Sequence, residues 1–171
     1  MILIEQRIVY IVFPLTETRI ADIHFFMPTG VKDCYDVEHT GMGAELAYEI
    51  MSSFGTNRCL FGTRVYYSHD VLYSDDCYNS AYLFGCIGIR KKEYCILIKQ
   101  YSKEEYEALV GKIKDHMNEM TYQGENWRPN KFGELFPIEI SPFAYNETNA
   151  QEYFPLTKEQ ALAEGYAWQN P

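Results

Sequence analysis

Residues 59–101 read CLFGTRVYYSHDVLYSDDCYNSAYLFGCIGIRKKEYCILIKQY, and this stretch decides the fold class. Cys59, Cys77 and Cys95 follow one another at equal intervals, and Cys86 lies midway between the last two. The same interval relates further apolar and aromatic positions, namely Leu60, Tyr78 and Ile96, and Val65, Leu83 and Tyr101. The spacing therefore indicates a structural repeat rather than a motif that occurs once.

A repeat of about 18 residues, the interval between these cysteines, is the size of one coil of a three-sided β-solenoid. Successive coils would lie about 4.8 Å apart, and their small cysteine and serine side chains would form ladders that face inward. We therefore expect a mainly β protein that contains some α structure. Its core would be a short β-solenoid over residues 33–101, with a coil of about 18 residues. The alternative is a twisted antiparallel sheet in which the cysteine spacing arises by chance.

The sequence after the repeat indicates an amphipathic helix. Ser102 and Glu105 form a capping box, in which each side chain accepts a hydrogen bond from the other residue's backbone N–H. Apolar residues then recur at helical spacing, at Tyr106, Leu109, Val110, Ile113, Met117 and Met120. We expect a helix over residues 102–120 that caps the β core.

Residues 121–171 show no sustained period, and proline and aromatic residues alternate through much of this segment. This pattern predicts an extended aromatic tail that wraps the domain. Thr157 and Gln160 form a second capping box, which predicts a short helix over 158–164 ended by Gly165. Residues 43–52 fit either a helix or a buried strand.

The N-terminal part, residues 1–30, is expected to hold short strands at Ile2–Ile4 and Ile8–Phe13. Its charged residues interrupt the apolar run that a signal peptide would need. No apolar run reaches the ~18 residues of a membrane span, so no membrane partner is expected. With five cysteines, an odd number, reduced thiols and a cytoplasmic location are predicted. We expect a single domain over residues 1–171.

Two blocks of the sequence are specific strings rather than loose patterns. The first block is Leu83–Arg90 (LFGCIGIR) with Tyr94–Tyr106 (YCILIKQYSKEEY). The second is Gly133–Thr148 (GELFPIEISPFAYNET) with Ala150–Leu162 (AQEYFPLTKEQAL) and Gly165–Trp168 (GYAW). Both blocks are similar to a family of uncharacterised cysteine-rich proteins from uncultivated small bacteria, and the resemblance covers roughly residues 33–168.

This resemblance implies a solenoid-like repetitive region, often accompanied by zinc-ribbon modules, and it implies no activity or catalytic residue. The chain departs from the family in two respects. It has no Cys-x-x-Cys pair, and Ile98 stands where the family usually has asparagine. The chain therefore lacks the zinc modules and is a short, divergent or partial member.

Four cysteines of the repeat are the candidates for a metal site: Cys59, Cys77, Cys86 and Cys95. A structural zinc site needs four ligands, which are usually delivered as close pairs, and these spacings do not supply such pairs. In stacked coils, Cys59, Cys77 and Cys95 would stand in line rather than at the corners of a tetrahedron. Buried free thiols that act as small apolar side chains are the alternative, and no cofactor is expected.

The candidates for a catalytic site are Cys77, His69 and Asp70, because thiol catalysis needs a base near the nucleophile. The alternative is that His69 and Asp70 are solvated corner residues of a coil. A hexapeptide-repeat acyltransferase shares the coil length only, since its aliphatic residue at every sixth position is missing. The cluster Arg90–Lys92 could bind a nucleic-acid strand, but a net charge of −9 makes nucleic acid unlikely as a partner.

The sequence favours a non-enzymatic structural or protein-interaction module, with a protein partner or a homo-oligomer as its assembly. The alternatives are an enzyme with a cysteine and histidine site on the β face, or an accessory protein for metal or nucleic acid.

Overall fold

The computed structural model describes residues 19–22, 31–123, 129–134 and 136–170. The chain divides into two compact units. The first unit ends at Asp115, and the second contains the described residues from His116 onward. The strands expected at Ile2–Ile4 and Ile8–Phe13 lie outside the described residues.

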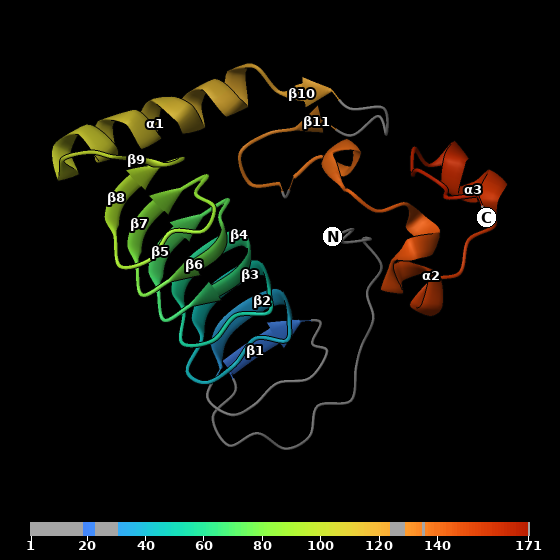
Figure 1. Cartoon of the computed structure of the whole chain (residues 1–171), viewed down its shortest axis with the longest axis horizontal. Helices are drawn as coiled ribbons and strands as arrows, with labels where there is room; N and C mark the ends of the chain where they lie inside the picture. Colours follow the sequence, from blue (N-terminus) through green and yellow to red (C-terminus); the bar gives the residue numbers. More distant parts are fainter. Residues whose placement is uncertain (1–18, 23–30, 124–128, 135, 171) are drawn as a thin grey trace. The chain divides into compact units, whose positions relative to one another are not determined.

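The first unit is a β-solenoid of about five turns, so the predicted mainly β solenoid is confirmed. Its first wall is a stack of parallel strands, in the order β1 (Arg19–Asp22), β2 (Lys32–Glu38), β3 (Glu45–Met51), β4 (Asn57–Tyr66), β5 (His69–Leu72), β7 (Ala81–Phe84) and β8 (Glu93–Ile96). Figure 1 shows these strands stacked from β1 in blue to β8 in yellow-green. The segment 43–52, for which the sequence left helix and buried strand open, contains strand β3.

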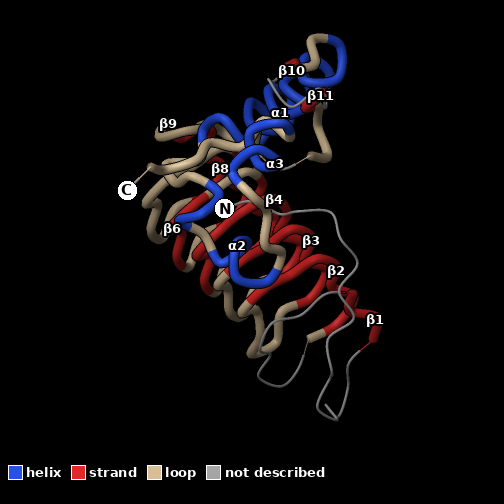
Figure 2. The backbone as a smooth tube through the Cα atoms, turned by 90° about the vertical axis from the view of Figure 1, so that its right-hand side faces the viewer, coloured by secondary structure: helices blue, strands red, loops and turns tan. Residues whose placement is uncertain are grey.

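A second wall begins where the chain turns a corner of the coil. It contains the C-terminal part of β4, which pairs in parallel with β6 (Asp75–Tyr78). β6 in turn makes single parallel bridges to Ile87 and Arg90. The red strands and tan corners of Figure 2 show this coiled course of the chain.

The coil is 12 residues long, because hydrogen bonds between equivalent positions of consecutive coils join residues at this separation. The expected coil of about 18 residues is therefore wrong. The strand register agrees, since it pairs Asn57 with His69, His69 with Ala81, and Ala81 with Glu93. The interval between Cys59 and Cys77 is one and a half coils, and it takes the chain from one wall to the other.

The inward side chains recur at every third residue, and this explains why both intervals occur in the sequence. In a regular strand, every second side chain faces the same side. Here the residue before each inward position has a positive φ, as at Arg58 (51°), Arg64 (49°) and Asp70 (55°). This left-handed residue lengthens the repeat of inward side chains from two residues to three. The inward positions from Cys59 onward, over slightly more than two coils, are Cys59, Gly62, Val65, Ser68, Val71, Ser74, Cys77, Ser80, Leu83 and Cys86, and all of them are buried.

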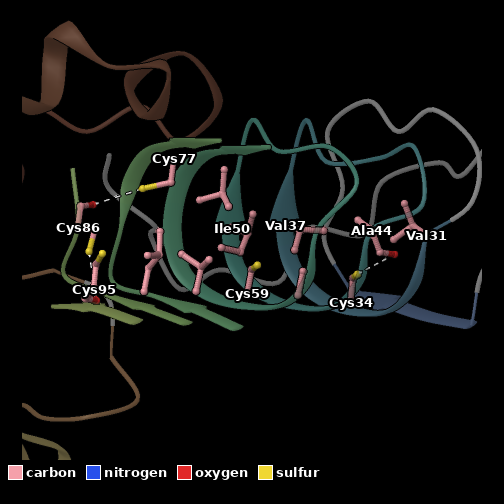
Figure 3. Packing of buried hydrophobic residues seen from close by; sticks show 13 residues of the cluster. Val31, Cys34, Val37, Ala44, Ile50, Cys59, Cys77, Cys86 and Cys95 are labelled. Carbon is pink, nitrogen blue, oxygen red and sulfur yellow. Dashed lines mark hydrogen bonds between the residues drawn. The ribbon is translucent and has the colours of Figure 1, made fainter. Parts of the chain in front are cut away.

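Gly62 shows how closely neighbouring coils approach. A Cβ atom at this position would lie 2.7 Å from the carbonyl oxygen of Ser74 in the next coil. Only glycine leaves space for that backbone. The core around it is made of small inward side chains, and Figure 3 shows them filling the narrow space between the walls.

Helix α1 (Lys103–Glu119) follows the last coil, close to the predicted bounds of 102–120. The backbone N–H of Glu105 donates to Ser102 Oγ, and the N–H of Ser102 donates to the Glu105 carboxylate, so the predicted capping box is confirmed. Tyr106 is buried and packs edge-on against Tyr82 and Tyr94 of the last two coils. Before the helix, β9 (Lys99–Gln100) folds back antiparallel to β8 and covers its outer edge.

The second unit has little β structure. β10 (Tyr122–Gln123) pairs antiparallel with β11 (Pro129–Asn130), and short helical segments follow: η1 (Ile138–Ile140), η2 (Tyr145–Glu147), α2 (Asn149–Tyr153) and α3 (Lys158–Ala163). Thr157 caps α3 together with Gln160, as the sequence predicts. Tyr145 is the centre of this unit, because it is fully buried and its hydroxyl donates to the Phe154 carbonyl at 2.6 Å. That the tail, residues 121–171, wraps the solenoid stays a prediction.

Candidate functional site

All five cysteines are free thiols that lie buried in the core of the solenoid. Figure 3 shows Cys34, Cys59 and Cys95 along one wall and Cys77 on the opposite wall. The register agrees, because Cys59 belongs to the stack of Val71, Leu83 and Cys95, whereas Cys77 pairs with Val65. The expectation that Cys59, Cys77 and Cys95 stand in one line is therefore wrong.

The thiols contact backbone carbonyls across the interior of the coil. Cys59 Sγ lies 3.5 Å from the carbonyl oxygen of Ser68, and Cys77 Sγ lies 3.7 Å from that of Cys86. Cys86 Sγ lies 3.4 Å from the carbonyl oxygen of Cys95. Each contact joins residues nine positions apart, which is three quarters of a coil. The separation of nine is a multiple of the three-residue inward period, and the thiols of Cys77 and Cys86 each reach the carbonyl of the next cysteine in the sequence.

Burial makes these thiols poor nucleophiles. It raises the pKa of Cys59 to about 12 and that of Cys86 to about 12, and it also raises the pKa values of Cys34, Cys77 and Cys95. The thiolate is the reactive form, so a raised pKa leaves almost none of it at neutral pH. Within the described ranges, no group of three or more His, Cys, Asp or Glu side chains is placed to hold a metal ion.

The candidate catalytic residues do not meet in one site. His69 and Asp70 are together on the outside of the first wall, where His69 Nδ1 lies 2.7 Å from Asp70 Oδ2. Cys77 instead points into the core from the second wall. No thiol of the described chain is therefore presented to the outward-facing imidazole of His69.

Asp70 is held mainly by an arginine of the preceding coil. Arg58 Nε and Nη2 each donate to a different Asp70 oxygen at 2.7 Å, which is a bidentate ion pair. This contact, followed by the hydrogen bond from His69, lowers the pKa of the Asp70 carboxyl. Arg58 and Asp70 are 12 residues apart, so the pair ties two consecutive coils together.

Aromatic ladders on the outside of the solenoid are the feature that the sequence reading missed. Tyr66 stacks on Tyr78 and Tyr82 stacks on Tyr94, with ring centroids 4.7 Å apart in both pairs. The Arg90 guanidinium lies over the Tyr78 ring at 4.3 Å and continues the first of these ladders. The signal was present in the sequence, because the two tyrosines of each pair are separated by the length of one coil.

The cluster Arg90–Lys92 lies on the last coil of the second wall and its following corner. Arg90 is 3.5 Å from Asp76, and all three side chains are exposed. Lys92 follows Ser68 and Ser80 in an inward stack, yet its side chain is exposed, because the described residues form no coil beyond it.

None of the described helices is long and apolar enough to cross a membrane. Comparisons of the chain with protein-family models, with curated proteins and with solved structures each found no match.

Proposed function

We propose that this protein is a non-enzymatic structural or protein-interaction module that works in a reducing compartment such as the cytoplasm. The observation that carries the proposal is the position of its nucleophiles. All five thiols are in the core with raised pKa values, and they contact backbone carbonyls there. Unpaired thiols in the core also favour a compartment in which disulfides do not form.

The outer surface supports the same proposal. Outward side chains of neighbouring coils contact each other and join one coil to the next. Arg58 forms an ion pair with Asp70, and Tyr82 stacks on Tyr94. A repetitive, rigid surface of this kind suits the display of an extended contact area. We also infer that the chain is a divergent member of the cysteine-rich solenoid-like family, on the strength of the two sequence blocks in 83–106 and 133–168.

An enzyme built on His69 and Asp70 is the second candidate. The 2.7 Å contact between His69 Nδ1 and Asp70 favours it. In catalytic triads, a carboxylate orients the imidazole that serves as the base for the nucleophile. Against it, the same carboxylate is already paired with Arg58, and Cys77 lies in the core. The two proposals differ in what they expect of the thiols.

Alkylation of the native chain by iodoacetamide separates them. The module proposal expects all five cysteines to react far more slowly in the native state than in a guanidinium-unfolded control, which mass spectrometry measures peptide by peptide. An enzyme would show one cysteine that reacts faster in the native chain than in the unfolded control, and slower after His69→Ala. That result would overturn the proposal.

A further inference from the structure

The two walls of the solenoid end differently at the last coil. On the first wall, β9 pairs with β8 and covers its outer edge. On the second wall, the last rung is formed by Ile87 and Arg90, which bridge to Asp75 and Tyr78. The chain then returns to the first wall as β8 and reverses into β9, so no further rung of the described chain follows Ile87 and Arg90.

The preceding rung shows which backbone groups this end presents. The N–H of Asp75 donates to the Cys86 carbonyl at 2.9 Å, and its carbonyl accepts from the Gly88 N–H at 3.0 Å. Tyr78 makes the equivalent pair of bonds with Ile89 and Lys91. Both residues therefore point their backbone groups toward the next coil.

Ile87 and Arg90 occupy these same two positions one coil later. Their N–H and C=O groups accordingly point away from β6, and in the part of the chain that the structure describes none of the four groups has a hydrogen-bond partner. The residues of this edge are also accessible to solvent, since the Ile87 side chain is 71% exposed and Gly88 and Arg90 are exposed. An edge with unpaired donors and acceptors favours the addition of another strand.

The charges around this edge indicate the kind of segment that would bind there. Three cations, Arg90, Lys91 and Lys92, outnumber two carboxylates: Asp76, which lies 3.5 Å from Arg90, and the exposed Glu93 that follows Lys92. Lys91 and Lys92 form no ion pair with the described residues. A second copy of the chain would bring the same three cations to the edge, whereas an acidic segment would complement them. Half-buried Ile89 and exposed Ile87 add apolar surface beside the backbone groups.

We infer that the edge Ile87–Arg90 is a docking site for an extended acidic peptide segment of a partner protein, which adds to the second wall as its next rung. The inference rests on the proposed function and names the site and partner class for it. The segment would place apolar side chains over Ile87 and Ile89, and carboxylates beside Arg90, Lys91 and Lys92.

Amide hydrogen exchange on the full-length chain, followed by NMR, tests this site with an internal control. The amides of Ile87 and Arg90 should exchange rapidly, while those of Asp75 and Tyr78, one coil below, should be protected. The probe is the acetylated peptide Val-Gly-Val-Glu-Asp-Glu, and its control is Val-Gly-Val-Lys-Lys-Lys. The acidic peptide should slow exchange at Ile87 and Arg90 by about tenfold or more at saturation, and the basic peptide should not.

Two variants identify the contacts. Ile87→Pro removes an N–H that has no partner inside the described chain, so it should abolish peptide binding and leave the thermal unfolding curve in place; Ile87→Val is its matched control. Should Ile87→Pro fail to fold, the double change Lys91→Glu and Lys92→Glu provides the test. It should weaken binding about tenfold or more, whereas Lys112→Glu, at an exposed position of α1, should not.

Three results would overturn the inference. Protection of Ile87 and Arg90 in the free protein would mean that the chain itself or a second copy covers the edge, and dependence on protein concentration separates these two. Protection by single-stranded oligothymidine but not by the acidic peptide would make the edge a nucleic-acid surface. Unchanged peptide binding after the lysine reversals would exclude an acidic partner. Each result is independent of thiol reactivity, which tests the proposed function.

Discussion

At the scale of single residues, small polar side chains replace part of the backbone hydrogen bonding between coils. Ser74 is the clearest case, because its Oγ accepts from the Cys86 N–H at 3.0 Å and donates to the Leu72 carbonyl at 2.9 Å. Ser53 and Ser80 make the same pair of bonds with residues of their own coil and the next. These hydroxyls let an inward position be polar, since their donors and acceptors are satisfied.

Ser74→Ala should therefore cost more stability than the loss of a surface hydroxyl. The change leaves the buried Cys86 N–H without its acceptor, and an unsatisfied buried amide costs about 1–3 kcal/mol. Urea unfolding monitored by circular dichroism measures the loss. Lys112→Ala, at an exposed position of α1, is the control, and an equal effect of both changes would contradict this role for Ser74.

Asp70 should link stability to pH. Its pKa is lowered in the folded state, chiefly by Arg58, so its contribution is present above the unfolded pKa of about 3.9 and is lost as the pH falls through the folded value. Asp70→Asn should thus destabilise the protein at pH 7, and the difference from the unmodified chain should shrink below about pH 4. Unfolding curves from pH 7 to pH 2.5 measure this difference. A difference that grows as the pH falls would contradict the sign.

At the scale of elements, α1 closes part of the end of the solenoid through one aromatic side chain. Tyr106 is 6% exposed, and its ring packs edge-on against Tyr82 and Tyr94 at 6.4 and 5.9 Å between centroids. Burial raises the pKa of the Tyr106 hydroxyl, with smaller contributions from Cys86, Asp70 and Cys95. Because Cys86 and Cys95 belong to the same last coils as Tyr82 and Tyr94, we expect Tyr106 to help shield their thiols.

Tyr106→Ala should destabilise the chain by about 3 kcal/mol or more, as expected for the loss of a buried aromatic ring. The same change should speed the alkylation of Cys86 and Cys95, because their cover is removed. Tyr106→Phe keeps the ring and should change alkylation little. Mass spectrometry after timed iodoacetamide treatment gives both rates, and equal protection in the alanine variant would show that α1 does not shield these thiols.

At the scale of the whole molecule, the solenoid could be predicted from the cysteine spacing, but the length of its coil could not be predicted from that spacing alone. The equal spacing of the cysteines is real, but their interval is a multiple of the three-residue inward period rather than of the coil. Any interval divisible by three keeps a side chain in the core, so Cys59 and Cys77 both face inward although they lie on different walls. The register depends on which backbone groups pair across coils, and small inward side chains carry little of that information.

The outward residues held the missing signal. Tyr82 with Tyr94, and Arg58 with Asp70, contact each other across neighbouring coils and share one sequence interval. Their contacts exist only between adjacent coils, so they report the coil length directly. The capping boxes of α1 and α3 were predictable for the opposite reason, since a cap is made within four consecutive residues. The predicted catalytic site of Cys77, His69 and Asp70 does not form, because His69 faces outward and Cys77 faces inward. These directions follow from the three-residue period, which the sequence analysis did not include.

The most direct test of the coil length is a disulfide cross-link between two outer positions of the first wall. Asn57 and His69 are paired in the register, so Asn57→Cys with His69→Cys should place two Cα atoms about 4.8 Å apart, within the range that a disulfide spans. The matched pair Asn57→Cys with Asp75→Cys has the same sequence interval as Cys59 and Cys77 and joins different walls. After oxidation with oxidised glutathione, peptide mass spectrometry should find the cross-link in the first variant only. A cross-link in the second variant and none in the first would contradict the coil described here.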